Sequence, residues 1–184
     1  SIHFSLPKGY NGIYIGIPGK QADQDPRLAA IAEIFAGTPV TLHLSDDILL
    51  DIWDKFGLNV SRNLPQAILG VGIGAYDDST YVDAIMRQMR HEVVLVANAK
   101  GIPLKEEFQA GKWLPTQRYS TLQDLDAHRH TEIDMFSGAL VRMGKELGIA
   151  CPYNEMTYNL IKALEEKNDG KFDYERDLAC HSRG

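Results

Sequence analysis

The chain has 184 residues, of which 44% are hydrophobic and 24% are charged, a composition that is ordinary for a globular protein. Its formal net charge of −6 argues against a general nucleic-acid-binding protein, which needs a basic face. No apolar run approaches the roughly 20 residues of a membrane span, and no signal peptide is visible, so we expect a cytoplasmic protein with neither nucleic-acid nor membrane partners.

The first 44 residues predict a small β/α segment. Two β-type stretches, one helix and one further strand are predicted in chain order over residues 2–4, 13–17, 28–35 and 41–44. Asp25 and Pro26 supply an N-cap and a first-turn proline for the helix. Because so few short strands bury little surface by themselves, we expect this segment to be the end of a larger unit that lies before Ser1.

From Ser45 to residue 184 the sequence predicts a helical domain with a polar C-terminal tail. Ser45 is the predicted N-cap of a first helix, which should run through Asn59 and break or kink near Pro65. Further helices are predicted over residues 79–100, 103–112, 120 onward, 132–147 and 153–167. Ser120-Thr121-Leu122-Gln123 matches a capping box, which would make Ser120 the cap of its helix.

Lys55, Asn59 and Asn63 follow one another at spacings of four, so they form one polar stripe on the first helix of this domain. One interpretation is a lysine proton donor held by two amides at the wall of a pocket, since lysine suits general acid work on a carbonyl oxygen. The alternative is that Lys55 pairs with Asp51 while the asparagines cap a kink at Pro65. The pattern alone leaves both open.

Two further motifs carry no site by themselves. GVGIGA, residues 70–75, matches G-x-G-x-x-G/A, but it follows a helix and lacks the β-strand that a dinucleotide fingerprint requires, so we expect a connector. His128, His130 and Glu132 lack a fourth ligand and a suitable spacing, and Cys151 and Cys180 lack metal-ligand spacing altogether. We therefore predict no metal site.

Taken together, the motifs resemble the C-terminal domain of ketopantoate reductases (2-dehydropantoate 2-reductases). That family has a W-x-K helix with asparagines four and eight residues beyond the lysine, matched here by Trp53, Lys55, Asn59 and Asn63. It then has a serine before L-Q-D, a T-E-I-D segment and a G-x-x-P-x-N segment, matched here by residues 120–124 and 131–134 and loosely by residues 148–155. The resemblance covers roughly residues 45–166.

The resemblance implies a mainly α fold, with a helical domain like the C-terminal domain of 6-phosphogluconate dehydrogenase behind a remnant of a nucleotide-binding domain. It also implies reduction of ketopantoate to pantoate with NADPH, in pantothenate biosynthesis. By position in the motifs, Lys55 would protonate the forming alkoxide, and Asn59 and Asn63 would hold the lysine and substrate oxygens. Ser120 would contact the substrate carboxylate. Glu132 would lie by the nicotinamide end of the cofactor and help position the lysine.

Of the family's N-terminal Rossmann domain, which holds most of the NADPH site, the residues before Ser45 match only the end. We therefore expect that the chain is a fragment and does not reduce ketopantoate alone. Two alternatives remain: a related reductase of another 2-keto acid, and a non-catalytic helical module for dimerisation or ligand binding. An apolar surface normally covered by the partner domain would favour a homodimer.

Overall fold

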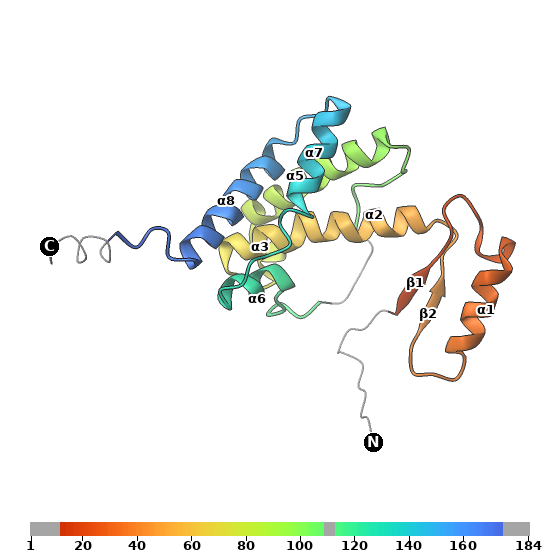
Figure 1. Ribbon diagram of the computed structural model, residues 1–184. Helices are drawn as coiled ribbons and strands as arrows, with labels where there is room; N and C mark the ends of the chain where they lie inside the picture. Colours follow the sequence, from red (N-terminus) through yellow and green to blue (C-terminus); the bar gives the residue numbers. More distant parts are fainter. Residues whose placement is uncertain (1–11, 109–112, 175–184) are drawn as a thin grey trace, which may run out of the picture. The chain divides into compact units, whose positions relative to one another are not determined.

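The computed structural model of the protein describes residues 12–108 and 113–174 (Figure 1). The chain divides into two compact units, residues 1–54 and 55–184, and each is described here by itself. The predicted fold class is confirmed, because the described residues are mainly helical with one small two-stranded sheet. The predicted domain boundary between residues 44 and 45 stays a prediction, and the predicted β stretch at residues 2–4 lies outside the described residues.

The first unit contains a parallel pair of strands joined through a helix. Strands β1 (Ile13–Ile15) and β2 (Leu42–Leu44) pair in parallel, and helix α1 (Pro26–Phe35) lies between them in the sequence, as a parallel pair requires. The predicted N-cap is confirmed: Asp25 is 5% exposed and accepts a hydrogen bond from the backbone N–H of Arg27. Its carboxylate also forms ion pairs with Arg27 and Lys20, which hold the pKa of Asp25 well below its ordinary value.

Helix α2 (Ile48–Leu58) leads from the first unit into the second and continues there without a break at Pro65. A π-helical segment (Asn59–Asn63) follows it directly, and then α3 (Leu64–Leu69), which ends at Gly70 with a φ of +67°. The predicted break near Pro65 is therefore wrong, whereas a kink there stays a prediction. Pro65 lies in the first turn of α3, directly after the π-helical segment, where its missing N–H is tolerated.

The core of the second unit forms around the long helix α5 (Thr80–Ala99), which packs against the π-helical segment and against α7 (Ser137–Leu147) and α8 (Pro152–Asn168). The short helix α4 (Ala75–Asp78) precedes α5, and α6 (Ser120–Asp126) packs against α3 and α8. The fully buried apolar side chains on these helices and on the π-helical segment are Val60, Leu64, Met89, Val93, Val96, Ala97, Leu140 and Ile161, and Ile133 on the turn before α7 is fully buried too. None of the helices in the described ranges combines the length and apolar character that a membrane span needs.

Three helix predictions need correction. Asp47 rather than Ser45 caps α2, since it accepts from the N–H of Leu50 at 3.1 Å while the Ser45 hydroxyl donates to Asp51. Residues 103–108 are not helical, because side chains of α5 take their carbonyl groups, as Arg90 does with Lys105 at 2.8 Å. Residues 109–112 of that predicted helix lie outside the described residues. Residues 132–136 form turns, so α7 begins five residues later than predicted, at Ser137.

A buried carboxylate of α5 caps the start of α8. Glu92 is 5% exposed and accepts hydrogen bonds from the backbone N–H groups of Tyr153 at 2.9 Å and Asn154 at 3.0 Å. It also accepts from the Asn154 side-chain amide at 2.6 Å. The N-cap residue Cys151 supplies no side-chain cap, so Glu92 satisfies N–H groups that a helix start leaves without intrahelical partners, and its charge matches the positive end of the helix dipole.

Glu92→Ala should lower the free energy of unfolding by about 2–4 kcal/mol, because the cap is lost and the buried Asn154 amide loses its acceptor. Urea unfolding followed by circular dichroism measures this difference. Glu146→Ala, an exposed glutamate on α7, is the matched control and should change stability by less than about 0.5 kcal/mol. An equal loss of unfolding free energy in the two variants would contradict the proposed capping role of Glu92.

Candidate functional site

Asn63 and Ser120, which are 57 residues apart in the sequence, are in direct contact. The Asn63 side chain is 2% exposed; its Nδ2 donates to the hydroxyl of Ser120, and its Oδ1 accepts from the N–H of Thr121, both at 3.3 Å. Asn63 therefore joins the π-helical segment to the first turn of α6 and does not cap a kink at Pro65. The capping-box prediction is wrong, because Tyr119 is the N-cap of α6 and Ser120 its first residue.

Gln66 is a site residue that the sequence analysis missed. It lies three residues after Asn63 and is fully buried. Its Nε2 donates to the carbonyl of Gln117 at 3.1 Å, and its Oε1 accepts from the N–H of Tyr119 at 2.6 Å. One signal was present: a glutamine within the apolar run 64–69, spaced to extend the polar stripe beyond Asn63.

The GVGIGA loop packs against the same segment. The N–H groups of Ile73 and Gly74 donate to the carbonyls of Gln117 and Pro115 at 3.0 and 2.9 Å. A Cβ on Gly72 would lie 2.3 Å from the Pro115 carbonyl oxygen, so this approach requires glycine. Gly72 and Gly74 thus serve a close approach to Pro115, and the interpretation of the loop as a connector stays a prediction.

The polar side-chain atoms of Lys55 and Asn59 make no hydrogen bond with the described residues of their unit. Lys55 is exposed and makes no hydrogen bond or ion pair with the described residues of its own unit. Asn59 is half-buried at the start of the π-helical segment, and its side chain likewise has no hydrogen-bond partner among the described residues of that unit. A π-helix changes the rotation per residue, so the stripe predicted on α-helical geometry is altered after Asn59, at a kind of helix defect that is frequent at functional sites.

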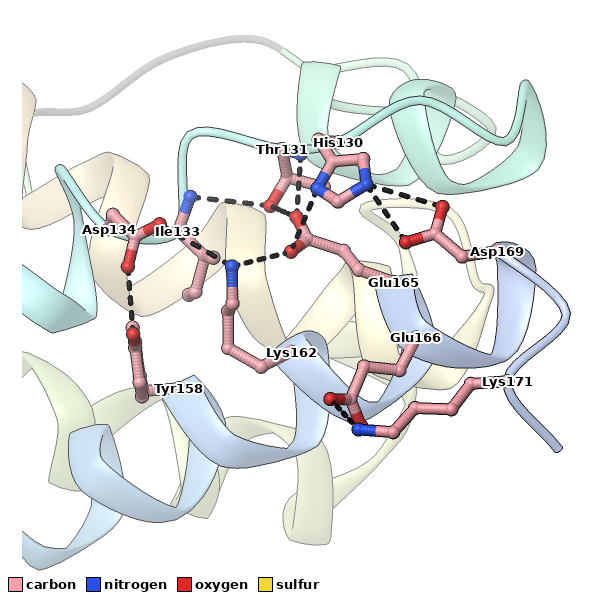
Figure 2. A network of polar contacts seen from close by, with 10 residues as sticks. All are labelled: His130, Thr131, Ile133, Asp134, Tyr158, Lys162, Glu165, Glu166, Asp169 and Lys171. Carbon is pink, nitrogen blue, oxygen red and sulfur yellow. Dashed lines mark hydrogen bonds and ion pairs between the residues drawn. The ribbon is translucent and has the colours of Figure 1, made fainter.

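Glu132 lies between Thr131 and Asp134 in the chain, and both of these residues are bonded to α8. Figure 2 shows the contacts of Thr131 and Asp134 with that helix. On one side, the backbone N–H and the hydroxyl of Thr131 both donate to Oε1 of Glu165 at 2.7 Å. On the other side, Asp134 accepts from the hydroxyl of Tyr158 at 2.8 Å and from Lys162 at 3.4 Å. The side chain of Glu132 itself is left exposed.

Glu165 is the buried charge in this network, with a side chain only 1% exposed. Oε2 of Glu165 lies 2.9 Å from Nζ of Lys162 and 3.7 Å from Nδ1 of His130. Nε2 of His130 lies 3.1 Å from Oδ2 of Asp169 (Figure 2). Burial raises the pKa of Glu165, but the hydrogen bonds from Thr131 and the ion pair with Lys162 lower it by more, so the carboxyl pKa lies below its ordinary value. In the ranges that the structure describes, no group of three or more His, Cys, Asp or Glu side chains could hold a metal ion.

A cleft of about 360 Å³ lies elsewhere on the second unit, between α5 and residues 106–108. Its lining mixes both charges with apolar groups and comprises Arg62, Tyr76, Asp77, Asp83, Met86, Arg87, Glu106, Glu107 and Phe108. None of the predicted site residues lines this cleft. Of those residues, the structure joins Asn63 with Ser120; no hydrogen bond or ion pair among the described residues links Lys55, Asn59 or Glu132 to that pair.

Comparisons with known proteins identify relatives of this chain. The family model described as ketopantoate reductase PanE/ApbA C terminal matches residues 47–165. A 2-dehydropantoate 2-reductase of Pyrobaculum aerophilum is 32% identical over 143 residues, covering 75% of this chain and 51% of that protein. A second one, of Caulobacter vibrioides, is 31% identical and 49% covered, so the chain spans about half the length of the curated relatives it matches.

Two solved structures extend this likeness. A PanE/ApbA family ketopantoate reductase from Ralstonia eutropha JMP134 has a TM-score of 0.73 and 29% identity, covering 88% of this chain and 53% of that one. A D-mandelate dehydrogenase in complex with NADH has a TM-score of 0.68 and 27% identity, covering 75% of this chain and 49% of that one.

The lowered pKa of Glu165 predicts that this residue contributes to stability above its unfolded pKa, near 4.5, and that this contribution is lost as the pH falls through the folded pKa. At pH 7 we expect Glu165→Gln to lower the free energy of unfolding by about 1–3 kcal/mol. The difference from wild type should narrow as the pH falls below 4.5, as measured by urea unfolding at several pH values.

Glu166→Gln is the matched control on the same turn of α8. Its ion pair with Lys171 is partly exposed, so the loss at pH 7 should stay under about 1 kcal/mol. A difference between wild type and Glu165→Gln that widened on acidification would show that the burial cost dominates and would contradict the prediction.

Proposed function

Because the chain belongs to the ketopantoate reductase family, whose C-terminal domain model it matches over residues 47–165, we propose that it is the substrate-binding and catalytic half of an NADPH-dependent 2-dehydropantoate 2-reductase. The single observation that carries the proposal is the contact between Asn63 and Ser120. It brings together two motifs that lie far apart in the sequence, and it places a hydroxyl at the start of a helix with one hydrogen-bond partner already fixed.

The proposed reaction adds a hydride to the 2-keto carbon of ketopantoate and a proton to its oxygen, which gives pantoate. When bound, NADPH would supply the hydride. The nucleotide-binding domain would hold most of the cofactor. Lys55 supplies the proton. Its ammonium group is a compact donor, and a fixed positive charge stabilises the developing alkoxide more than the neutral ketone, which lowers the barrier.

The proposed roles of Asn59, Asn63 and Ser120 follow from their hydrogen-bond partners. Asn63 is committed to Ser120 and Thr121, so it orients the serine. The Ser120 oxygen accepts from Asn63, and its own O–H remains to be donated to the substrate carboxylate. Among the described residues of its unit Asn59 has no such partners, and in the proposal it is the amide that contacts the substrate oxygens and Lys55.

Glu132 completes the proposed site at the nicotinamide end of the cofactor, on a turn that Thr131 and Asp134 fasten to α8. The proposal includes the division into a nucleotide-binding remnant over residues 1–44 and a catalytic domain over residues 45–184, a cytoplasmic location and a homodimer. It also includes the inactivity of this chain alone, since the cofactor is held mainly outside it. No residue of the GVGIGA loop takes part.

One rival has support from a specific observation. A structure that is 27% identical to this chain is a D-mandelate dehydrogenase, an enzyme of another 2-hydroxy acid. A reductase of another 2-keto acid would use the same lysine and serine with a different side-chain pocket. The non-catalytic helical module is the second rival, and it predicts no dependence of any activity on Lys55.

Lys55→Ala should lower kcat for ketopantoate reduction by about 10²–10⁴-fold, because the proton donor is lost, while KM changes much less. The assay uses the complete protein that carries this chain, with NADPH oxidation followed at neutral pH. Lys100→Ala, an exposed lysine after α5, is the matched control and should keep wild-type turnover.

Three other outcomes separate the rivals. Full activity of Lys55→Ala would remove the lysine from the mechanism. A folded, NADPH-binding wild type that ignores ketopantoate but reduces another 2-keto acid would favour the related reductase. Absence of turnover with every 2-keto acid tried would favour the non-catalytic module.

A further inference from the structure

The segment that leads into Ser120 has no regular secondary structure of its own. Residues 114–119 are neither helix nor strand, so their backbone groups need partners from elsewhere in the chain. The N–H of Gln117 donates to the carbonyl of Leu114 within the segment, and the side chain of Gln123 on α6 donates to the carbonyl of Arg118 at 2.8 Å. The carbonyls of Pro115 and Gln117 and the N–H of Tyr119 have partners from elsewhere in the chain. These partners come from Gln66 on α3 and from the loop at Ile73 and Gly74.

Gln66 holds this segment at two points with one side chain. Its amide nitrogen donates to the carbonyl of Gln117, and its amide oxygen accepts from the N–H of Tyr119, so it binds the backbone on both sides of Arg118. The side chain is fully buried, and an unpaired amide there would be costly. The contact therefore fixes both the segment and the glutamine.

We propose that Gln66 is a positioning residue for the substrate-binding serine. Gln66 sets the backbone of residues 117–119, and Asn63, three residues earlier on the same helix, then orients the hydroxyl of Ser120 and the N–H of Thr121. Gln66 acts on the substrate only through Ser120. The inference rests on the proposed function, because it assumes that Ser120 contacts the substrate carboxylate.

The chemistry of the contact requires a neutral amide. A glutamate would keep the acceptor for Tyr119 but would place a carboxylate oxygen against the carbonyl of Gln117. A methionine keeps the length and flexibility of the side chain and removes both hydrogen bonds. Gln66→Met is therefore the sharpest variant. Val96→Ala, a fully buried position on α5, serves as the control for a loss of stability that does not involve residues 114–121.

In the complete protein, Gln66→Met should raise KM for the 2-keto acid about tenfold or more and change kcat by less than threefold. Ser120→Ala should raise KM as well. The double variant should have the same KM as Ser120→Ala alone, because both changes remove the same contact between Ser120 and the substrate. Val96→Ala should leave KM unchanged. A purely structural role for Gln66 would give an unchanged KM, or a loss that adds to that of Ser120→Ala, and either result would overturn the inference.

Amide hydrogen exchange on the same protein gives a readout that does not need a substrate. Gln66→Met should speed exchange of the Tyr119 and Thr121 N–H groups at least tenfold relative to Val96→Ala. Unchanged exchange would overturn the inference by itself. If exchange speeds up but Ser120→Ala leaves KM unchanged, the proposed role of Ser120 has failed, and the inference that depends on it fails for that separate reason.

Discussion

The second unit depends on a simple constraint: a side-chain amide that is buried in a helical core has to find both a donor and an acceptor. Asn63 and Gln66 meet this constraint by binding backbone and hydroxyl groups of residues 117–121. An unmet buried polar group costs on the order of 1–3 kcal/mol, so each amide disfavours any arrangement in which this segment lies elsewhere. The same contacts that keep the core satisfied thus keep Ser120 in place.

Two buried carboxylates likewise connect other segments of the fold through hydrogen bonds. Glu92 on α5 accepts from the first N–H groups of α8, and Glu165 on α8 accepts from Thr131, next to Glu132. In each case a rigid helix supplies a polar group that holds a less regular segment. The turn that carries Glu132 is thus held by Thr131 and Asp134, while the side chain of Glu132 itself is exposed.

The sequence predicted the parts of the fold that local rules govern. Asp25 with Pro26 marks the start of α1 through backbone preferences that act within a few residues. One error was local, since Asp47 rather than Ser45 caps α2, but others arose where distant residues decide. Ser120 has the local signature of a cap, yet its hydroxyl is taken by Asn63, and residues 103–108 lose a helix because the side chains of α5 bind their carbonyl groups. Gln66 was missed for the same reason, since its partners lie some 50 residues away. Lys55, Asn59 and Asn63 were singled out by their spacing, whereas the roles of the motif residues come from the resemblance and stay predictions.

The π-helical segment between α2 and α3 has a consequence for insertions and deletions. A widened turn holds one residue more than an α-helical turn, so the loss of one residue within 59–63 can be absorbed by a return to regular α-helix. A deletion within α3 would instead rotate every following side chain by about 100°. Gln66 would then face away from Tyr119. A one-residue deletion in the π-helical segment should therefore leave the orientation of Gln66 unchanged, while it would shorten the spacing between Lys55 and Asn63.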